Sequence, residues 1–518
     1  MSIDKNHPVK IMRSTSVMSL GTLASRILGF IRDIIFARFF GTAAGADAFV
    51  VAFRLPNLFR DMIGEGAANS SFVPVMTEYK ETRPQELAEF LNVILAWAFI
   101  ILCAITFLGV VLAPVVVRLI APGFAADPGK INMTVMLTRM MFPYLVFIGL
   151  TALFSAIQFT YGSFTMPAFG PCWLNVALIA STLASVWWMK QPVYGLAYGV
   201  LAGGAIQLYF QWRPLRKHGV KFSWALTLNH PGARQIGKLL LPRLVGSAVY
   251  QLNIFVDTIC ASLTMIVGAG GIAAIYYANR IVQFPMGIFG VALASAALPA
   301  FSSFAVSGKT EDFKRTVLFT LENILLLMLP MTIFLSLFST PIVHAVFQRG
   351  EFNAYSTTVT SSALFFFSLG LLGYGAVKIL VSAFHAMQDT QTPVKVALVS
   401  LAVNAGLNVA LMFPMKISGI ALASAISSVV NVVLLLTALK KRVGNFSSQF
   451  VPFLGKIIVA GAAQAAASFL VWQNLSGLHE TWRLGIVFVA GLLVYGAISW
   501  ILGIEQVVGL RKIFSLRV

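Results

Sequence analysis

Eight cationic side chains lie inside apolar segments of the sequence, where a charge is expensive. A cation at the centre of a bilayer costs about 2.5–3.5 kcal/mol on insertion scales, so eight cations that faced lipid would cost on the order of 20 kcal/mol. These side chains are therefore expected to face protein or a water-filled cavity. The eight are Arg26, Arg32, Arg38, Arg54, Arg60, Arg243, Arg280 and Lys378.

Acidic side chains at a similar depth can neutralise only part of this charge. They are Asp33, Asp47, Asp61, Glu65, Asp257 and Glu322. The remaining cationic excess predicts a cavity that binds an anion. Arginine dominates, and its planar fork matches phosphate oxygens bidentately while it stays charged, so the expected ligand group is a phosphate or pyrophosphate. The predicted substrate-binding residues are Arg26, Arg32, Arg54, Arg60, Arg280 and Lys378, and the predicted cavity acids or coupling residues are Asp33, Asp47 and Glu65.

Several of these charges also have a structural interpretation. Arg32 is followed directly by Asp33, and the two could form a structural ion pair. Arg38 lies near the end of its apolar segment and could extend to the headgroups. Arg60 precedes Asp61 and could belong to an ion network. The sequence leaves these alternatives open.

The elements that must position these charges are membrane-spanning helices. The chain has 518 residues, of which 58% are hydrophobic and only 11% charged, against about 25% charged in soluble domains. Runs such as 91–117 exceed the roughly 20 apolar residues that cross a bilayer, and the alternation of a membrane barrel is missing. The prediction is an all-α polytopic membrane protein. About fourteen spans are expected, at 15–40, 47–76, 90–117, 134–160, 166–187, 192–213, 236–265, 269–300, 316–339, 357–386, 393–413, 418–439, 453–473 and 482–504.

The distribution of loop charge predicts the orientation. The net charge is +19, but the positive residues gather on one side of the predicted spans, which indicates a membrane rather than nucleic acid as partner. Loops on the side of the N-terminus carry 22 Lys and Arg, and the other side carries at most seven. The positive-inside rule then places both termini in the cytoplasm. The outer loops are expected to hold Lys130, Lys190, Arg349, Lys416 and Arg483.

The chain also looks duplicated. Arg54 and Arg280 lie 226 residues apart, and so do Pro167 and Pro393. Six spans separate the copies, so both have the same orientation, as in two-lobed transporters. The prediction is two pseudo-symmetric six-helix lobes plus a C-terminal helix pair. The predicted boundaries are 1–213 for the N-lobe, 214–235 for a basic linker, 236–440 for the C-lobe and 441–518 for the last two helices and tail.

Motifs for other activities are missing from the sequence. It has no Walker A loop, no G-x-S-x-G elbow and no H-E-x-x-H pair. Its three cysteines lack ligand spacing, so no metal or other cofactor is predicted. The expectation is a transporter without an ATPase motif and without catalytic residues, whose basic loops contact anionic phospholipids.

Several segments together carry a resemblance to a known family. They resemble the MurJ (MviN) family of lipid II flippases, within the multidrug/oligosaccharidyl-lipid/polysaccharide exporter superfamily. The likeness covers most of the chain. The segments are 25–33 (SRILGFIRD), 46–49 (ADAF), 53–58 (FRLPNL), 64–67 (GEGA), 276–280 (YYANR), 284–285 (FP), 347–352 (FQRGEF) and 388–395 (QDTQTPVK).

The resemblance implies a fourteen-helix fold with the two lobes arranged as a V, and a groove for a lipid tail on the last two helices. It associates with function four arginines and two acids, at Arg26, Arg32, Arg60, Arg280, Asp47 and Glu65. The sequence departs from some members at Asn279, where they have Asp, and at Ala273, where they have Ser. An ion coupling that relies on that acid is therefore not implied here.

Charge pattern and resemblance together predict a flippase of the bacterial inner membrane. It would move lipid II, the undecaprenyl-pyrophosphate-linked peptidoglycan precursor, to the periplasmic leaflet by alternating access of a cationic cavity, and so serve cell wall biogenesis and cell shape. A flippase for another polyprenyl-pyrophosphate-linked glycan and a non-transporting scaffold for envelope assembly remain as alternatives. Coupling to the membrane potential or to an ion is left open, as are contacts with other peptidoglycan synthesis proteins.

Overall fold

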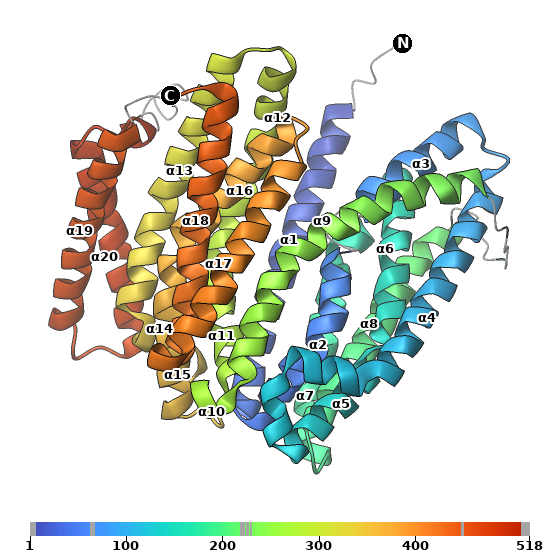
Figure 1. Ribbon diagram of the computed structural model, residues 1–518, viewed down its shortest axis with the longest axis horizontal. Coiled ribbons are helices and arrows are strands. Elements are labelled where there is room, and N and C mark those ends of the chain that lie inside the picture. Colours follow the sequence, from blue (N-terminus) through green and yellow to red (C-terminus); the bar gives the residue numbers. More distant parts are fainter. Residues whose placement is uncertain are drawn as a thin grey trace. The chain divides into compact units, whose positions relative to one another are not determined.

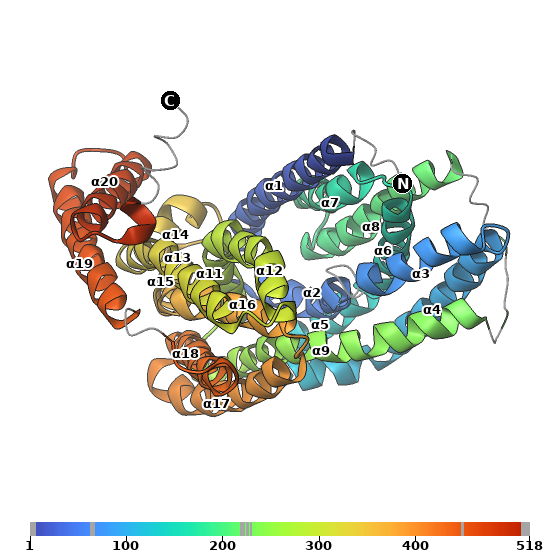
Figure 2. The same ribbon diagram turned by 90° about the horizontal axis from the view of Figure 1, so that it is seen from above.

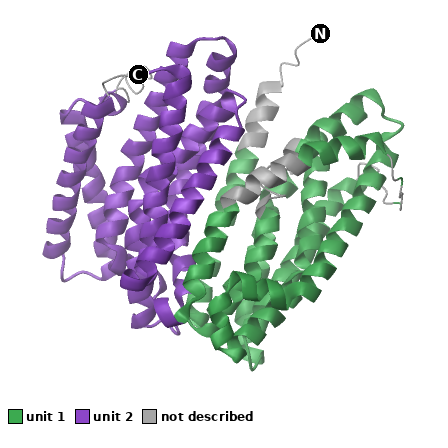
Figure 3. Ribbon diagram, in the orientation of Figure 1, with its two compact units in different colours: residues 1–264 green, residues 265–518 purple. Residues whose placement is uncertain are grey.

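The computed structural model describes the backbone of residues 7–62, 68–217, 223, 227, 230–446 and 450–508, and this part of the chain is helical and contains no strand (Figure 1). The chain divides into two compact units, residues 1–264 and 265–518 (Figure 3). The predicted all-helical class is confirmed.

Unit 1 contains nine α-helices and one short 3₁₀ helix within the described residues. They are α1 (His7–Phe40), α2 (Ala44–Met62), α3 (Ala68–Thr82), α4 (Leu87–Ile120), η2 (Pro122–Ala126), α5 (Pro128–Met141), α6 (Tyr144–Thr160), α7 (Thr165–Trp188), α8 (Val193–Lys217) and α9 (Pro231–Ser262). The short α10 (Thr264–Val267) lies at the boundary between the units.

Unit 2 contains ten further α-helices and one π turn within the described residues. They are α11 (Gly271–Pro285), η3 (Met286–Gly290), α12 (Val291–Val306), α13 (Thr310–Leu337), α14 (Ser339–Phe347), α15 (Ala354–Leu369), α16 (Leu371–Ala386), α17 (Gln391–Met415), α18 (Ile417–Val443), α19 (Phe450–Asn474) and α20 (Glu480–Ile501).

Ten helical segments among the described residues are long and apolar enough to cross a membrane, and the bent pair α15–α16 makes an eleventh. The protein is therefore a multi-pass membrane protein. The helices α1, α2, α3 and α9 are not among them. The sequence of α1 contains the charged residues Arg26, Arg32, Asp33 and Arg38. The count of fourteen spans stays a prediction.

Some predicted continuous spans are broken in the structure. The predicted span 357–386 is two helices that meet at Gly370 and are bent by 45°. The predicted span 269–300 contains the π turn η3 directly after Pro285. A proline lacks the N–H that the regular ladder needs, and π turns commonly occur where the ladder is interrupted. For the predicted span 47–76, the structure describes α2 as far as Met62 and α3 from Ala68, and residues 63–67 lie outside the described part of the chain.

The helix boundaries repeat with the offset found in the sequence. α5 begins at Pro128 and α15 at Ala354, while α7 begins at Thr165 and α17 at Gln391, so both pairs are offset by 226 residues. The chain is therefore built from two copies of one helical pattern, and α19 and α20 have no counterpart in the first copy.

The contacts of α9 differ from its place in the repeat. The predicted C-lobe, 236–440, begins within α9, yet α9 packs on α2, α3, α4 and η2 of unit 1. The packing is close at Gly232, where a Cβ atom would lie 2.4 Å from the Phe90 ring, which itself stacks on Tyr79. By contacts the chain divides after Thr264, one helix later than the repeat suggests. Ten of the 22 residues of the predicted linker, 214–235, lie outside the described residues.

The last two helices are attached to α13 around Pro330, a proline within that helix. Pro330 has no N–H to donate to the carbonyl of Leu326, four residues earlier. The Tyr495 hydroxyl of α20 donates to that Leu326 oxygen at 3.1 Å, and the Gln464 amide of α19 donates to the Pro330 oxygen at 3.0 Å. Figures 1 and 2 show α19 and α20 side by side along the edge of unit 2. Their docking therefore satisfies carbonyl groups around Pro330.

Asp389 caps the start of α17 and supplies the first testable prediction. One carboxylate oxygen accepts from the N–H groups of Gln391 and Thr392, both at 3.0 Å, and the other lies 2.6 Å from a guanidinium nitrogen of Arg442. Burial alone would raise the pKa of Asp389, but the hydrogen bonds from Thr392 and the charge of Arg442 outweigh it, so the pKa lies below its ordinary value.

A carboxyl group with a lowered pKa stabilises the folded state above its unfolded pKa, near 3.9, and loses this contribution as the pH falls through its lower folded pKa. Replacing Asp389 by asparagine removes the charge that pairs with the half-exposed Arg442, and should therefore lower the free energy of unfolding by about 0.5 kcal/mol at neutral pH and by less below pH 4. Thermal unfolding in detergent between pH 3 and pH 7 measures this. An equal loss at every pH would contradict it.

Candidate functional site

The middle of α1 holds Arg32 in a fixed position. Its guanidinium contacts the carboxylate of the adjacent Asp33 at 2.7 and 3.0 Å, and the side chains are 13% and 2% exposed. The third nitrogen of the guanidinium donates to the side-chain oxygen of Asn175 on α7 at 3.0 Å. The structural pair that adjacency in the sequence suggested is therefore present. It leaves Arg32 partly exposed at the surface of unit 1.

Asn175 is a residue that the sequence analysis missed. It is 6% exposed, and its amide nitrogen donates to the carbonyls of Ser25 on α1 and Pro171 on α7, at 3.1 and 3.2 Å. Gly29 lies opposite, where a Cβ atom would approach the Asn175 amide to 3.7 Å. One side chain thus ties two turns of α1 to α7 and orients Arg32. A polar amide in the middle of an apolar segment was the available signal.

Arg26 differs from Arg32 in its surroundings. Its side chain is exposed, and no hydrogen bond or ion pair joins it to another residue of the described part of the chain. Arg38, also exposed, lies against the ring of the adjacent Phe39 at 5.7 Å. Three arginines on α1 thus stand beside one aspartate, and the surface of this helix is net positive.

Asp47 lies in the first turn of α2 and is paired with a residue that the sequence placed in an outer loop. Lys130, in the first turn of α5, approaches the Asp47 carboxylate to 2.6 Å. The side chains are 1% and 7% exposed, so the pair is buried inside unit 1. Lys130 was missed because its partner lies 83 residues away, and no local pattern links the two positions.

The remaining predicted residues of unit 1 lie on α2 or just beyond it. Arg54 and Arg60 are half-buried, on either side of Pro56, which lies within the helix. Glu65 lies outside the described residues. The structure thus brings Asp33 together with Arg32, and Asp47 together with Lys130. Whether any of these residues binds substrate stays a prediction.

In unit 2, Arg280 occupies the position equivalent to Arg54. Its guanidinium lies over the Tyr276 ring at 4.8 Å, donates to the Tyr276 hydroxyl at 3.2 Å and approaches the Gln283 side-chain oxygen at 3.4 Å. The tyrosine, one helical turn away, holds the half-buried arginine with neutral contacts. Lys378 on α16 is exposed, and no hydrogen bond or ion pair joins it to another residue among those described.

The two departures from the family pattern lie on the same helix as Arg280. Asn279 is half-buried, and Ala273 is completely buried. Within the described residues no group of three His, Cys, Asp or Glu side chains could hold a metal ion.

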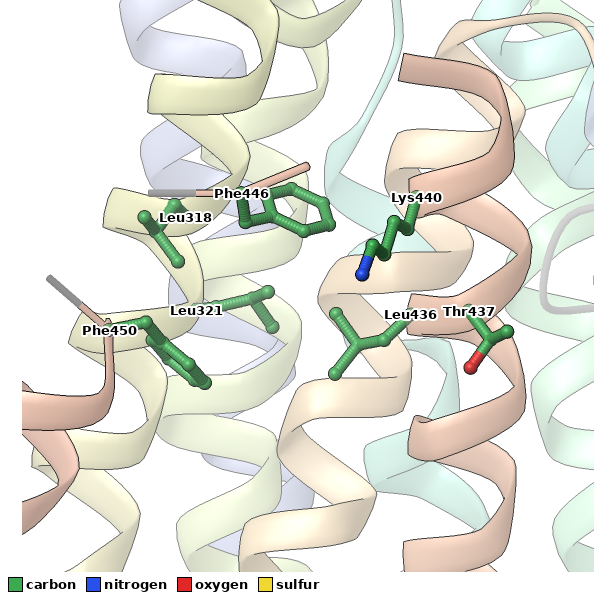
Figure 4. A pocket seen from close by; sticks show the side chains of 7 residues that line it. All are labelled: Leu318, Leu321, Leu436, Thr437, Lys440, Phe446 and Phe450. Atoms are coloured by element: carbon green, nitrogen blue, oxygen red, sulfur yellow. The ribbon is translucent and has the colours of Figure 1, made fainter. Parts of the chain in front are cut away.

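A small apolar crevice of about 170 Å³ lies within unit 2 (Figure 4). One wall comes from α18, and the other comes from α13 together with Phe446, which follows α18, and Phe450, the first residue of α19. Lys440 is the only charged residue of the lining. The lining residues are Leu318, Leu321, Leu436, Thr437, Lys440, Phe446 and Phe450.

Comparison with known proteins decides the family. A family model described as lipid II flippase MurJ matches residues 36–493. The chain belongs to the MurJ family. A probable lipid II flippase MurJ of Haemophilus influenzae is 33% identical over 508 residues, which are 94% of this chain and 98% of the relative. The lipid II flippase MurJ of Burkholderia cenocepacia is 33% identical over 515 residues, which are 96% and 98% of the two chains.

Solved structures agree with this assignment. A structure of lipid II flippase MurJ in an inward closed conformation matches with a TM-score of 0.80 and 27% identity, over 95% of this chain and 99% of that chain. An inward-facing multidrug transporter of the MATE family matches with a TM-score of 0.68 and 15% identity, over 80% and 96% of the two chains, and therefore shares the fold. The resemblance to the MurJ family that the sequence motifs carry is confirmed.

Proposed function

We propose that this protein flips lipid II from the cytoplasmic to the periplasmic leaflet of a bacterial inner membrane, with both termini in the cytoplasm. Membership of the MurJ family, whose relatives are described as lipid II flippases, supports this function. The observation that carries the mechanism is the charge of α1, where Arg26 is exposed and Arg32 is oriented by Asn175 while still partly exposed. Guanidinium groups held in this way suit a pyrophosphate.

The polar head and the hydrocarbon tail of the substrate need different surroundings. The head carries the pyrophosphate and needs a sheltered, cationic route, for which Arg26, Arg32, Arg54, Arg60, Arg280 and Lys378 are the proposed contacts. The tail can remain in hydrocarbon. The crevice beside α19 supports a hydrocarbon contact there, because its lining is apolar apart from Lys440 and Thr437.

The transport cycle proposed is alternating access by movement of the two repeated units, as in other transporters built from such repeats. Asp33, Asp47 and Glu65 are the proposed acids of this cycle. An inside-negative potential could drive the export of a bound anion, or the return of the emptied cationic site, by about 2.3 kcal/mol per charge per 100 mV. The chain needs no nucleotide for such a cycle.

The test is flipping of labelled lipid II in proteoliposomes, with and without an imposed potential. Arg26→Ala should lower the flipping rate by roughly tenfold, because charge-assisted hydrogen bonds to an anion contribute about 1.5–3 kcal/mol each. Arg83→Ala is the matched control, since Arg83 is half exposed and pairs only loosely with Glu86, at 3.8 Å. An unchanged rate in Arg26→Ala would argue for a scaffold role instead. Equal flipping of another polyprenyl-pyrophosphate glycan would widen the substrate class.

A further inference from the structure

The buried pair of Asp47 and Lys130 is the centre of a connected corner of unit 1. An ion pair taken out of water needs further contacts to offset its desolvation. Here the Lys130 ammonium also lies over the ring of Phe124 in η2, at 4.1 Å from the ring centre. The carboxylate of Asp127 accepts from the Lys130 N–H at 3.0 Å and caps α5. The ion pair with Asp47, the Phe124 ring and the Asp127 carboxylate together hold Lys130 at the start of α5.

The same part of unit 1 contacts the end of α9 through η2. The N–H of Gly123 in η2 donates to the Ser262 hydroxyl at 3.1 Å. A Cβ atom on Gly123 would lie 2.0 Å from the Ser262 carbonyl oxygen, so the two backbones are in direct contact. Ser262 is the last residue of α9, two residues before unit 1 ends at Thr264. The path from Lys130 through Phe124 and Gly123 therefore reaches the point where the chain leaves unit 1.

On its other side the pair holds the turn that follows α1. Asp47 lies three residues after α2 begins, and its N–H donates to the Ala43 carbonyl in that turn at 3.2 Å. Gly41, with φ of +50°, lets the chain reverse directly after α1. The position of Asp47 thus fixes the end of the helix that carries Arg26 and Arg32.

We propose that Lys130 is a positioning residue for transport. Its ion pair with Asp47 clamps the first turn of α2, and with it the end of the arginine-bearing α1, onto the corner formed by η2 and the last turn of α9. The role of Asp47 in this arrangement is to supply the carboxylate of the ion pair. The inference rests on the proposed flippase function and deepens it, because it adds a residue that no charge pattern in the sequence marks.

The test uses paired variants in proteoliposomes to separate the effect of this ion pair on transport from its effect on the stability of the protein. Lys130→Met and Asp47→Asn should each lower lipid II flipping at least tenfold and lower the thermal midpoint, because each breaks the buried ion pair by removing one of its two charges. Combining the two should restore the thermal midpoint, since no buried charge remains, while flipping stays at least tenfold low. Exchanging the charges, in Asp47→Lys/Lys130→Asp, should recover flipping above either single variant. Lys190→Met, at an exposed outer lysine, is the control and should behave as the parent protein.

Hydrogen exchange gives a readout that does not depend on transport. In Lys130→Met the amides at 41–47 and 123–127 and at the end of α9 should exchange at least tenfold faster, with the rest of unit 1 unchanged. Parent-like flipping by the neutral double variant would overturn the proposal, and so would a charge exchange that folds without regaining flipping. Failure of the parent protein to flip lipid II would instead count against the proposed function.

Discussion

Replacing Gly123 by alanine should destabilise the protein by about 3 kcal/mol or more and abolish most of its flipping. The new methyl group would lie 2.0 Å from the carbonyl oxygen of Ser262 and 2.6 Å from the Cα atom of Leu263. Both are backbone atoms, so no side-chain rotation can relieve the overlap, and η2 or the end of α9 must move. Overpacking that displaces backbone costs typically 1–3 kcal/mol and occasionally more. Thermal unfolding in detergent and the proteoliposome assay measure the two effects.

Two other variants separate the overlap from its surroundings. Gly237→Ala changes a glycine in the same helix, α9, where the added methyl group meets nothing within 4 Å. It should be neutral or stabilise by about 0.5–1 kcal/mol, because alanine loses less entropy in a helix. Ser262→Ala removes the hydrogen bond from the Gly123 N–H and the one that the hydroxyl donates to the Ile259 carbonyl, without adding any overlap, and should cost about 1 kcal/mol. If Gly123→Ala matched Ser262→Ala in stability, the close approach of the backbones would not hold.

Much of the architecture follows from hydropathy, because a long uncharged run has few alternatives to a membrane helix. The run 91–117 became α4, Leu87–Ile120, and the repeat offset of 226 residues recurs in the helix boundaries. The breaks were less accessible. Gly370 lies within an uncharged and largely apolar stretch, 363–377, so hydropathy predicts one span where the structure has two helices. Hydropathy shows whether a segment prefers lipid or water, and it carries no information about bends of the backbone within that segment.

The charged residues show the same limit. Adjacency in the sequence suggested the Arg32–Asp33 pair, because neighbouring side chains can meet whatever the fold. Lys130 was assigned to an outer loop, since a charge usually marks the end of a span. Its burial against Asp47 depends on the packing of α2 on α5. Partners so distant along the chain follow only from tertiary structure. The contacts of α9 have a similar origin: they divide the chain after Thr264, and the repeat in the sequence carries no information about which helices pack together.

Asn175→Asp should weaken anion binding more than any single loss of an arginine contact, although it adds only one charge. The side-chain oxygen of Asn175 accepts from Arg32 at 3.0 Å. A carboxylate there would place a second negative charge beside Arg32, which Asp33 already contacts at 2.7 Å. The guanidinium would then lie between two acids, and its attraction for a pyrophosphate would be lost. A loss of about 3 kcal/mol, the upper range for hydrogen bonds to charged groups, corresponds to roughly 100-fold weaker binding.

The matched control is Asn92→Asp, which adds a carboxylate at another buried asparagine of unit 1. Asn92 is 7% exposed, and its oxygen accepts from the Ser223 N–H at 2.9 Å, with no cation in that contact. Both variants bury a new charge and should lose similar stability, but only Asn175→Asp should weaken the binding of a soluble pyrophosphate or of lipid II in a titration. Asn175→Leu completes the comparison, because it removes the contact to Arg32 without adding charge and should weaken binding by roughly tenfold. Equal affinity in all three would mean that the orientation of Arg32 by α7 plays no part in recognising the anion.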